Sequence, residues 1–194
     1  MMNQTKPVFA RRNFLKYSLI GLGSVAGLAA VGVGVFNTNQ YRDKYGKLMV
    51  LDGHLADIVH AFAEAAMPVG NGFPTIEEAE VVKRMDEELF FISENIQSDF
   101  KAVLYLVELL PFAYGKMSRF SRLPREERIE LLEKTADTEN DLTRVAVANA
   151  RMVTRLMYYG HPSSWKAIGY DGPFGNIPEQ LSEQRKYYAS ITKV

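Results

Sequence analysis

The sequence contains no cysteine among its 194 residues. This absence excludes a disulfide framework, a thiolate zinc site, a cysteine-held iron–sulfur cluster, covalently attached c-type haem and a cysteine nucleophile. The chain also lacks an excess of charge of either sign, because 23 Lys and Arg residues balance 23 Asp and Glu residues. A neutral composition argues against nucleic-acid binding, which normally needs a basic face. The classes of protein that remain are those whose function depends on partner proteins, on oxygen and nitrogen ligands, or on a membrane.

The neutral total hides two unlike segments. Residues 1–36 hold four of the 23 basic residues and no acidic residue, which leaves 19 basic against 23 acidic residues in 37–194. A basic, otherwise apolar start followed by a mildly acidic body is typical of a targeting segment joined to a folded domain. We therefore expect a signal or membrane anchor over 1–36 and one domain over 37–194.

The targeting segment carries a specific motif. Arg11 and Arg12 are followed, after one residue, by Phe14, Leu15 and Lys16, and then by an uncharged, Gly-rich run over 17–36. This order resembles the twin-arginine export signature. A run of this length can also cross a bilayer as a helix, so an ordinary amino-terminal anchor is the alternative interpretation. Basic residues ahead of the run predict that the body lies across the cytoplasmic membrane, in the periplasm.

The fate of the targeting segment is open at this stage. A signal-peptidase site requires small residues at the −3 and −1 positions, and only the weak matches 30–32 and 32–34 occur. The segment is therefore expected either to be cleaved or to stay as an anchor. Twin-arginine export carries folded proteins, often with a cofactor inserted, yet this chain shows no cofactor motif. The signal is thus predicted to serve a second polypeptide.

The body is predicted to be all-α. Apolar residues recur at helical spacing over five ranges, and turn residues separate these ranges. The expected helices are 48–67, 76–92, 100–110, 124–135 and 138–159. The third is the most apolar all round, which predicts that it is central in a bundle-like domain. A Gly- and Pro-rich segment after Gly160 predicts an irregular aromatic loop, and the polar last sixteen residues are expected to trail.

No residue pattern indicates an active site. His54, Asp57, His60 and Glu64 invite a metal site, but Leu55, Ile58 and Phe62 fall on the opposite side of the same helix. The His and acidic side is therefore expected to be the solvated face. His161 has no partner visible in the sequence and is expected at the surface. No nucleophile-elbow, zinc-protease or phosphate-loop pattern occurs, so we predict that the chain is not an enzyme.

Aromatic residues gather in one short segment. Residues 158–174 hold the only Trp of the chain together with three Tyr and one Phe, among Gly and Pro. Such aromatics are the usual anchors of protein interfaces. The alternative is that they cap the core of this same chain. The residues predicted to contact a partner are Tyr158, Tyr159, Trp165, Gly169, Tyr170, Asp171, Gly172, Pro173 and Phe174.

The same segment carries a family resemblance. The stretch Met157–Tyr159, followed by the stretch 165–173, is similar to the carboxy-terminal motif of the gluconate 2-dehydrogenase subunit 3 family. The twin-arginine start, Pro68 and the stretch 119–124 with Arg128 extend the similarity over most of the chain.

The resemblance implies a non-catalytic small subunit that helps to fold and co-export a partner. That partner is a flavoprotein dehydrogenase of the glucose-methanol-choline type. FAD is then expected in the large subunit, with haem c in a third, cytochrome subunit as the candidate electron acceptor, and no cofactor in this chain. The twin-arginine translocase and the membrane complete the expected partners. The alternative is an independent, membrane-tethered helical protein that binds a metal or small ligand through the face from His54 to Glu64.

Overall fold

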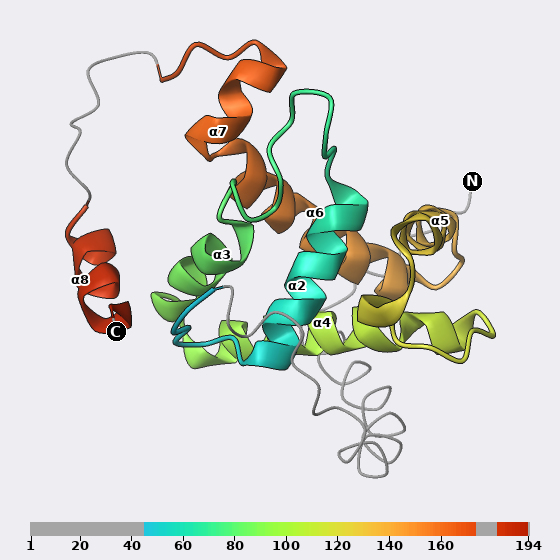
Figure 1. The fold of residues 1–194 in the computed structure, drawn as a ribbon. Coiled ribbons are helices and arrows are strands. Elements are labelled where there is room, and N and C mark those ends of the chain that lie inside the picture. The colour runs from blue at the N-terminus through green and yellow to red at the C-terminus, as the bar shows by residue number, and fades with distance from the viewer. Residues whose placement is uncertain (1–44, 174–181, 194) are drawn as a thin grey trace, which may run out of the picture. The chain divides into compact units, whose positions relative to one another are not determined.

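The computed structural model describes residues 45–173 and 182–193, and these residues are helical. The helices are α2 (Gly53–Ala66), α3 (Val81–Phe90), α4 (Glu94–Ala113), α5 (Arg125–Ala136), α6 (Asp141–Tyr159), α7 (Pro162–Trp165) and α8 (Glu183–Thr192), with 3₁₀ turns η1 (Phe120–Arg122) and η2 (Lys166–Ile168). No β-strand occurs within the described ranges (Figure 1). The all-α prediction is confirmed for this part of the chain, and the five expected helices correspond to α2–α6. The predicted targeting segment, with Arg11, Arg12, Phe14, Leu15 and Lys16, lies outside the described residues.

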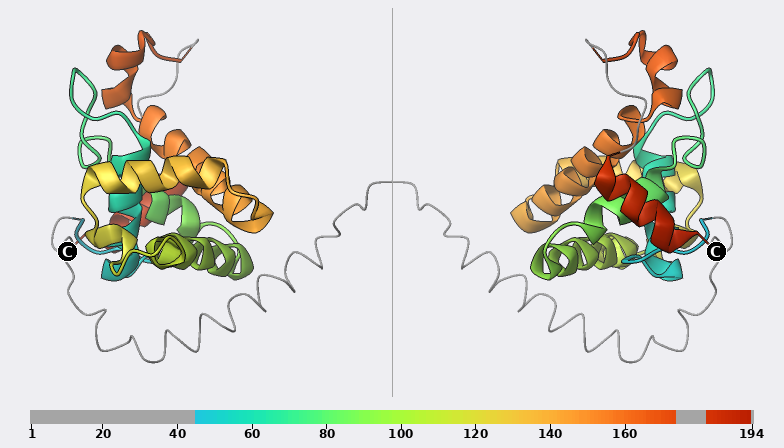
Figure 2. Two further views of the ribbon diagram at one scale, coloured as in Figure 1. Left: turned by 90° about the vertical axis from the view of Figure 1, so that its right-hand side faces the viewer. Right: turned by 90° about the vertical axis from the view of Figure 1, so that its left-hand side faces the viewer.

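Helix α2 is the central helix of the domain. It contacts α3, α4, α5 and α6. Figure 1 shows these helices beside and behind α2, and Figure 2 shows the same helices from two sides. All nine residues from Leu55 to Ala63 are buried. Asp52 caps its start by accepting a hydrogen bond from Leu55 N at 2.8 Å. The expectation that the third predicted helix would be central was wrong, because α4 leaves apolar residues such as Ile96 and Tyr105 exposed on its outer side.

Thr75 and Glu78 form a capping box, but it starts a single turn and not a long helix. Thr75 N donates to Glu78 Oε2 at 2.7 Å, and Glu78 N donates back to Thr75 Oγ1 at 3.1 Å. The turn ends at Glu80, whose φ of 48° is left-handed. Val81 N then donates to Ile76 O at 3.1 Å, as in a Schellman ending. The helix expected over 76–92 is therefore interrupted, and α3 begins only at Val81.

The stretch 119–124 closes the domain between α4 and α5. Phe120 is completely buried, and its ring lies 6.2 Å from that of Phe62 on α2. Ser121 donates from N at 2.9 Å and from Oγ at 2.7 Å to the buried carboxylate of Glu108. Helix α4 extends two residues past Pro111 before it ends. The residues that carry part of the family resemblance thus have a structural role in this chain.

The carboxy-terminal residues do not simply trail, in contrast to the sequence-based expectation. Residues 183–192 form α8, and Tyr188 on this helix is 2% exposed. Tyr188 Oη donates a 2.5 Å hydrogen bond to Asp86 Oδ2 on α3, and Tyr188 also packs edge-on against Phe90. One buried aromatic residue is enough to dock a polar helix, because the charged side chains can still face solvent. Sequence polarity alone gave no sign of this contact.

Candidate functional site

Helix α6 presents an apolar face that no described element covers. Val145, Met152 and Leu156 are 43%, 56% and 60% exposed. Their spacing of seven and four residues places them on one side of the helix. The opposite side is buried through Ala146, Val147, Ala150, Thr154, Met157 and Tyr158. The sequence pattern predicted the helix, but it did not distinguish the apolar side that faces the core from the one that faces out.

Tyr158, predicted to contact a partner, belongs to the core of this chain. Its side chain is completely buried, and its single O–H is shared between two carbonyl acceptors, Pro68 O at 2.6 Å and Pro74 O at 2.8 Å. Burial raises the pKa of Tyr158 to about 12, so the hydroxyl stays a donor at neutral pH. For this residue the alternative interpretation, an aromatic that fills its own core, is the one the structure supports. The reason is that two consecutive tyrosines on a helix point about 100° apart, and only one can face out.

Tyr159 and Trp165 order the turn that follows α6. Trp165 Nε1 donates to Tyr159 O at 3.1 Å, and the Trp165 ring meets that of Tyr170 edge-on at 5.3 Å. Gly169 adopts φ +68° and Gly172 adopts φ +112°. A Cβ added at Gly172 would lie 3.5 Å from the Trp165 ring. These backbone conformations favour glycine. The segment expected to be irregular is therefore held in two short helical turns, α7 and η2.

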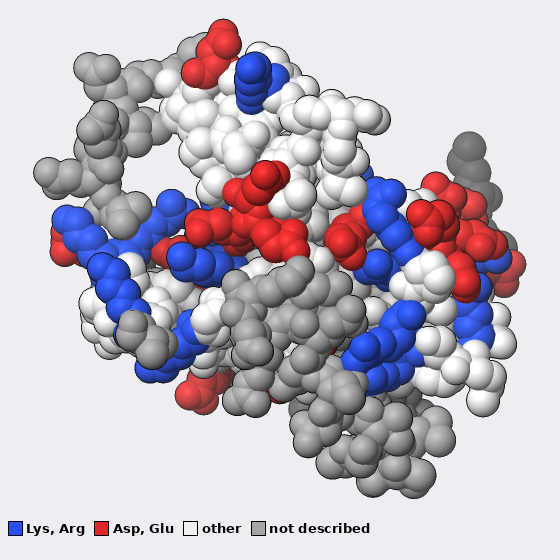
Figure 3. Space-filling model, viewed as in Figure 1, with Lys and Arg blue, Asp and Glu red and all other residues white. Residues whose placement is uncertain are grey.

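The end of the domain that carries α7 has an uncharged area below a charged tip. Figure 3 shows acidic and basic residues at the top of the view, a broad uncharged area beneath them, and most Lys, Arg, Asp and Glu residues lower down. Gly169, Asp171 and Pro173 are exposed, and Ile168 is 47% exposed. Phe174, the last residue of the predicted interface, lies outside the described residues. The structure thus leaves most of the predicted interface accessible, together with the apolar side of α6 that the sequence reasoning did not identify.

The His and acidic side of α2 is not a solvated face, contrary to expectation. Asp57 is 4% exposed and His60 is 1% exposed. His60 Nδ1 hydrogen-bonds to the Tyr45 hydroxyl, while His60 Nε2 lies 3.4 Å from Glu64 Oε1 and 3.7 Å from Glu77 Oε1. The prediction failed because it assumed that only one side of α2 is covered. A helix surrounded by other helices buries polar residues too, provided that they find partners.

Glu64 joins this cluster to α5. Arg128 Nη2 lies 3.0 Å from Glu64 Oε2, and Arg128 Nη1 donates to Ala61 O at 2.7 Å. Arg125 Nε donates to Glu64 O at 2.8 Å. Two arginines of α5 therefore bind carbonyl groups in the last turns of α2, where the helix dipole favours positive charge. The hydrogen bond and the charge of His60 and, after them, the hydrogen bond and the charge of Arg128 lower the pKa of Glu64 to about 2, against the opposing effect of burial.

This lowered pKa predicts a loss of stability in acid. The folded-state pKa of Glu64 lies below its ordinary value of 4.5. Its contribution to the free energy of unfolding is therefore fully present above about pH 4.5 and is lost as the pH falls toward 2. We expect Glu64→Gln to lower the free energy of unfolding at pH 7 by about 1–2 kcal/mol, a value reduced for the partial exposure of Glu64. The deficit relative to the unsubstituted protein should shrink between pH 5 and pH 2 in thermal denaturation. Glu139→Gln, at an exposed position, is the control, and a deficit independent of pH would contradict the assignment.

The structure adds no metal site to the α2 cluster. No group of three or more His, Asp and Glu residues is placed to hold a metal ion within residues 45–173 and 182–193. His54 does not join His60; its Nε2 lies 3.9 Å from Glu108 Oε1 instead. Ligand binding through the face from His54 to Glu64 stays a prediction, now for a face that is largely buried.

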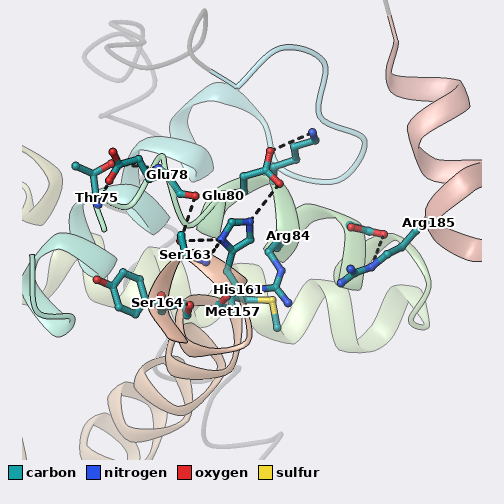
Figure 4. Close-up of polar contacts among 12 residues, drawn as sticks. Thr75, Glu78, Glu80, Arg84, Met157, His161, Ser163, Ser164 and Arg185 are labelled. Atoms are coloured by element: carbon teal, nitrogen blue, oxygen red, sulfur yellow. Dashed lines mark hydrogen bonds and ion pairs between the residues drawn. The ribbon is translucent and has the colours of Figure 1, made fainter. Parts of the chain in front are cut away.

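Arg84 and His161 make contacts that the sequence did not indicate. Arg84 of α3 is half-buried, and its Nη1 donates to Met157 O at 2.5 Å, at the end of α6. His161 caps α7 by accepting a hydrogen bond from Ser163 N at 3.3 Å (Figure 4). Local charge patterns gave no signal for either contact, because the partners are distant in the sequence or are backbone atoms.

Comparisons with known proteins give the chain no relatives. No family model matches it, and neither the curated proteins nor the solved structures contain a match. Within the described ranges, no helix combines the length and the apolar character that crossing a membrane requires.

Proposed function

We propose that this protein is a non-catalytic accessory subunit that binds, helps to fold and co-exports a flavin-containing dehydrogenase by the twin-arginine route. Residues 11–16 supply the export signal, and the helical body with its FAD-containing partner is delivered to the periplasm. The segment 17–36 then either anchors the complex in the cytoplasmic membrane or is removed. A cytochrome c subunit would complete the electron path outside this chain. The substrate is oxidised in the partner, so no catalytic residue is assigned here.

The observation that carries the proposal is the exposed apolar side of α6. Monomeric soluble proteins seldom expose apolar residues in rows, and such rows mark surfaces that another protein covers. Met152 suits this role because its flexible thioether side chain adapts to a partner surface. Leu156 lies one turn from the end of α6, so the row leads to the ordered turn of Trp165 and Tyr170. Together they offer an apolar helix side and an aromatic turn to one partner.

A double substitution on α6 tests the proposed interface. We expect Met152→Glu with Leu156→Glu to reduce recovery of a co-expressed flavoprotein dehydrogenase by at least about tenfold, because two carboxylates would be buried without partners. Both side chains are more than half exposed, so the unfolding temperature of the subunit alone should change little. Co-purification on a tagged subunit measures the first effect, and circular dichroism measures the second.

A single exposed methionine provides the matched control. Met117, between α4 and η1, is 94% exposed and lies apart from α6 in the chain. Met117→Glu should leave co-purification unchanged. If the dehydrogenase binds the α6 double variant as well as it binds the unsubstituted subunit, then α6 is not the interface.

A further inference from the structure

A pocket of about 480 Å³ lies beside α3. Four segments line it: 45–47 before α2, 80–87 on α3, 160–162 between α6 and α7, and 185–193 on α8. Its volume falls in the range of sites that hold small organic molecules. Helix α8 therefore forms one wall of this pocket, opposite α3 and the end of α6.

The lining of the pocket is strongly basic. Five Lys or Arg residues line it, against two Glu residues, although the body as a whole is mildly acidic. Lys83 Nζ lies 3.5 Å from Glu80 Oε1, and Arg185 Nε lies 3.4 Å from Glu87 Oε1. The excess of positive charge therefore persists after these pairs are formed. Such an excess in a concave site attracts anions.

Arg84 and Arg185 face each other across this pocket. The side chain of Arg185 extends from α8 toward α3, where Arg84 lies next to His161 (Figure 4). Burial and, after it, the charge of Arg185 lower the pKa of Arg84. Arg84 has a carbonyl partner, Met157 O, but it forms no ion pair within the described residues. Arg185 pairs with Glu87, whereas Arg84 is under the more distant charges of Glu80, Glu87 and Glu88 only. A bound oxyanion would offset the repulsion that remains between the two guanidinium groups.

The backbone around Arg84 is shaped to admit its guanidinium group. A Cβ at position 160 would lie 2.6 Å from Leu156 O and 3.2 Å from Arg84 Nη2, so only glycine leaves room there. Glu80, which lines the pocket, is held at a left-handed φ of 48° that costs a residue other than glycine about 1 kcal/mol. His161 adds a ring nitrogen to the same wall. Burial and, after it, the charge of Arg84 lower the pKa of His161, which favours the neutral ring at pH 7. A neutral imidazole can donate a hydrogen bond without adding to the repulsion.

We propose that this pocket binds a small organic anion whose carboxylate or phosphate group lies between Arg84 and Arg185. Arginine presents paired N–H donors that match the oxygens of either group, which a lysine point charge does not. The volume exceeds that of a bare ion, so the ligand carries an organic part that contacts Tyr45 and the α8 wall. Bound anion would tie α8 to α3 and α6 and so stabilise the carboxy-terminal part of the domain.

The unfolding temperature of the full chain, with citrate or inorganic phosphate as the probe, tests the proposal. Sodium chloride at equal ionic strength serves as the reference. Either probe should raise the unfolding temperature saturably, by about 5–10 °C at a concentration roughly one hundred times its dissociation constant. A response to citrate alone would assign a carboxylate ligand, and a response to phosphate alone would assign a phosphate ligand. A rise equal to that in chloride, or no saturation, would overturn the proposal.

Substitutions on α8 locate the effect. Arg185→Gln should weaken probe binding by about tenfold or more, because it removes charge-assisted hydrogen bonds. Lys186→Gln is the matched control, since Lys186 is the next residue, pairs with Glu183 at 2.7 Å and does not line the pocket. Lys83→Gln, at a half-exposed lining position, provides a second test if Arg185→Gln fails to fold. Equal probe binding by the control and by both lining variants would show that the anion binds elsewhere.

Discussion

Replacement of both Arg11 and Arg12 by Lys is expected to leave a co-expressed flavoprotein dehydrogenase in the cytoplasm. The substitution keeps the positive charge of the targeting segment but removes the planar, five-donor guanidinium groups that lysine cannot imitate. Twin-arginine signals are addresses read by a receptor, so identity matters more than charge. Near-complete loss of dehydrogenase activity from the periplasmic fraction, with activity retained in the cytoplasm, is the expected result.

Two controls separate this expectation from general damage. Lys6→Gln removes one positive charge from the same segment without altering the pair, and export should persist. A dehydrogenase fused to an export signal of its own should reach the periplasm even beside the Arg11→Lys, Arg12→Lys subunit. If the partner without its own signal is exported normally with that subunit, then it does not depend on this chain for targeting.

The second large effect is expected at Asp86, inside the body. This carboxylate is completely buried on α3, and it accepts hydrogen bonds from Met49 N at 2.7 Å, Val50 N at 2.9 Å and Leu51 N at 2.6 Å. It also accepts the Tyr188 hydroxyl, and burial together with this hydrogen bond raises the pKa of Tyr188. Asp86 thus joins the segment before α2, α3 and α8 at one point.

Asp86→Ala should lower the free energy of unfolding by about 3–5 kcal/mol, because four donors would lose their acceptor at once. For a domain of this size, the unfolding temperature should fall by about 6–20 °C. Tyr188→Phe removes one of the four hydrogen bonds and should cost about 1–2 kcal/mol, with earlier proteolysis of α8. Asp137→Ala, at an exposed position after α5, should be nearly neutral. A small effect of Asp86→Ala would mean that these donors find other acceptors.

Local signals predicted the helices well where the relevant physics is local. Pro124 and the acids after it predicted the start of α5, and α5 begins at Arg125. The apolar period with the polar start near Asn140 predicted α6, and Asn140 Oδ1 accepts a hydrogen bond from Thr143 N at 3.2 Å. These features depend on residues three or four positions apart, which a sequence displays directly. The capping box at Thr75 is local in the same sense, although Glu80 ends that turn early.

Burial was predicted less well, and the reason is the same at each position. Whether a helix side is covered depends on elements that are remote in the sequence. His60 is buried because Tyr45 and Glu77 cover it, and Leu156 is exposed because no described element lies over it. The hydropathy of each residue would favour the opposite arrangement. For the same reason the sequence did not show that Tyr158, a residue of the predicted interface, is buried, or that α6 leaves an apolar side exposed.

The sequence by itself determined the helical class, the approximate limits of α5 and α6, the gathering of positive charge in residues 1–36 and the exclusion of cysteine chemistry, because each depends on composition or on near neighbours. The tertiary structure alone decided that α2 is central, that α8 docks through Tyr188, and that Arg84 and Arg185 converge on one basic pocket. Arg84 and Arg185 are about one hundred positions apart in the chain, so only packing brings their charges together. Cooperation between such distant residues is a property of the fold, and no local pattern records it.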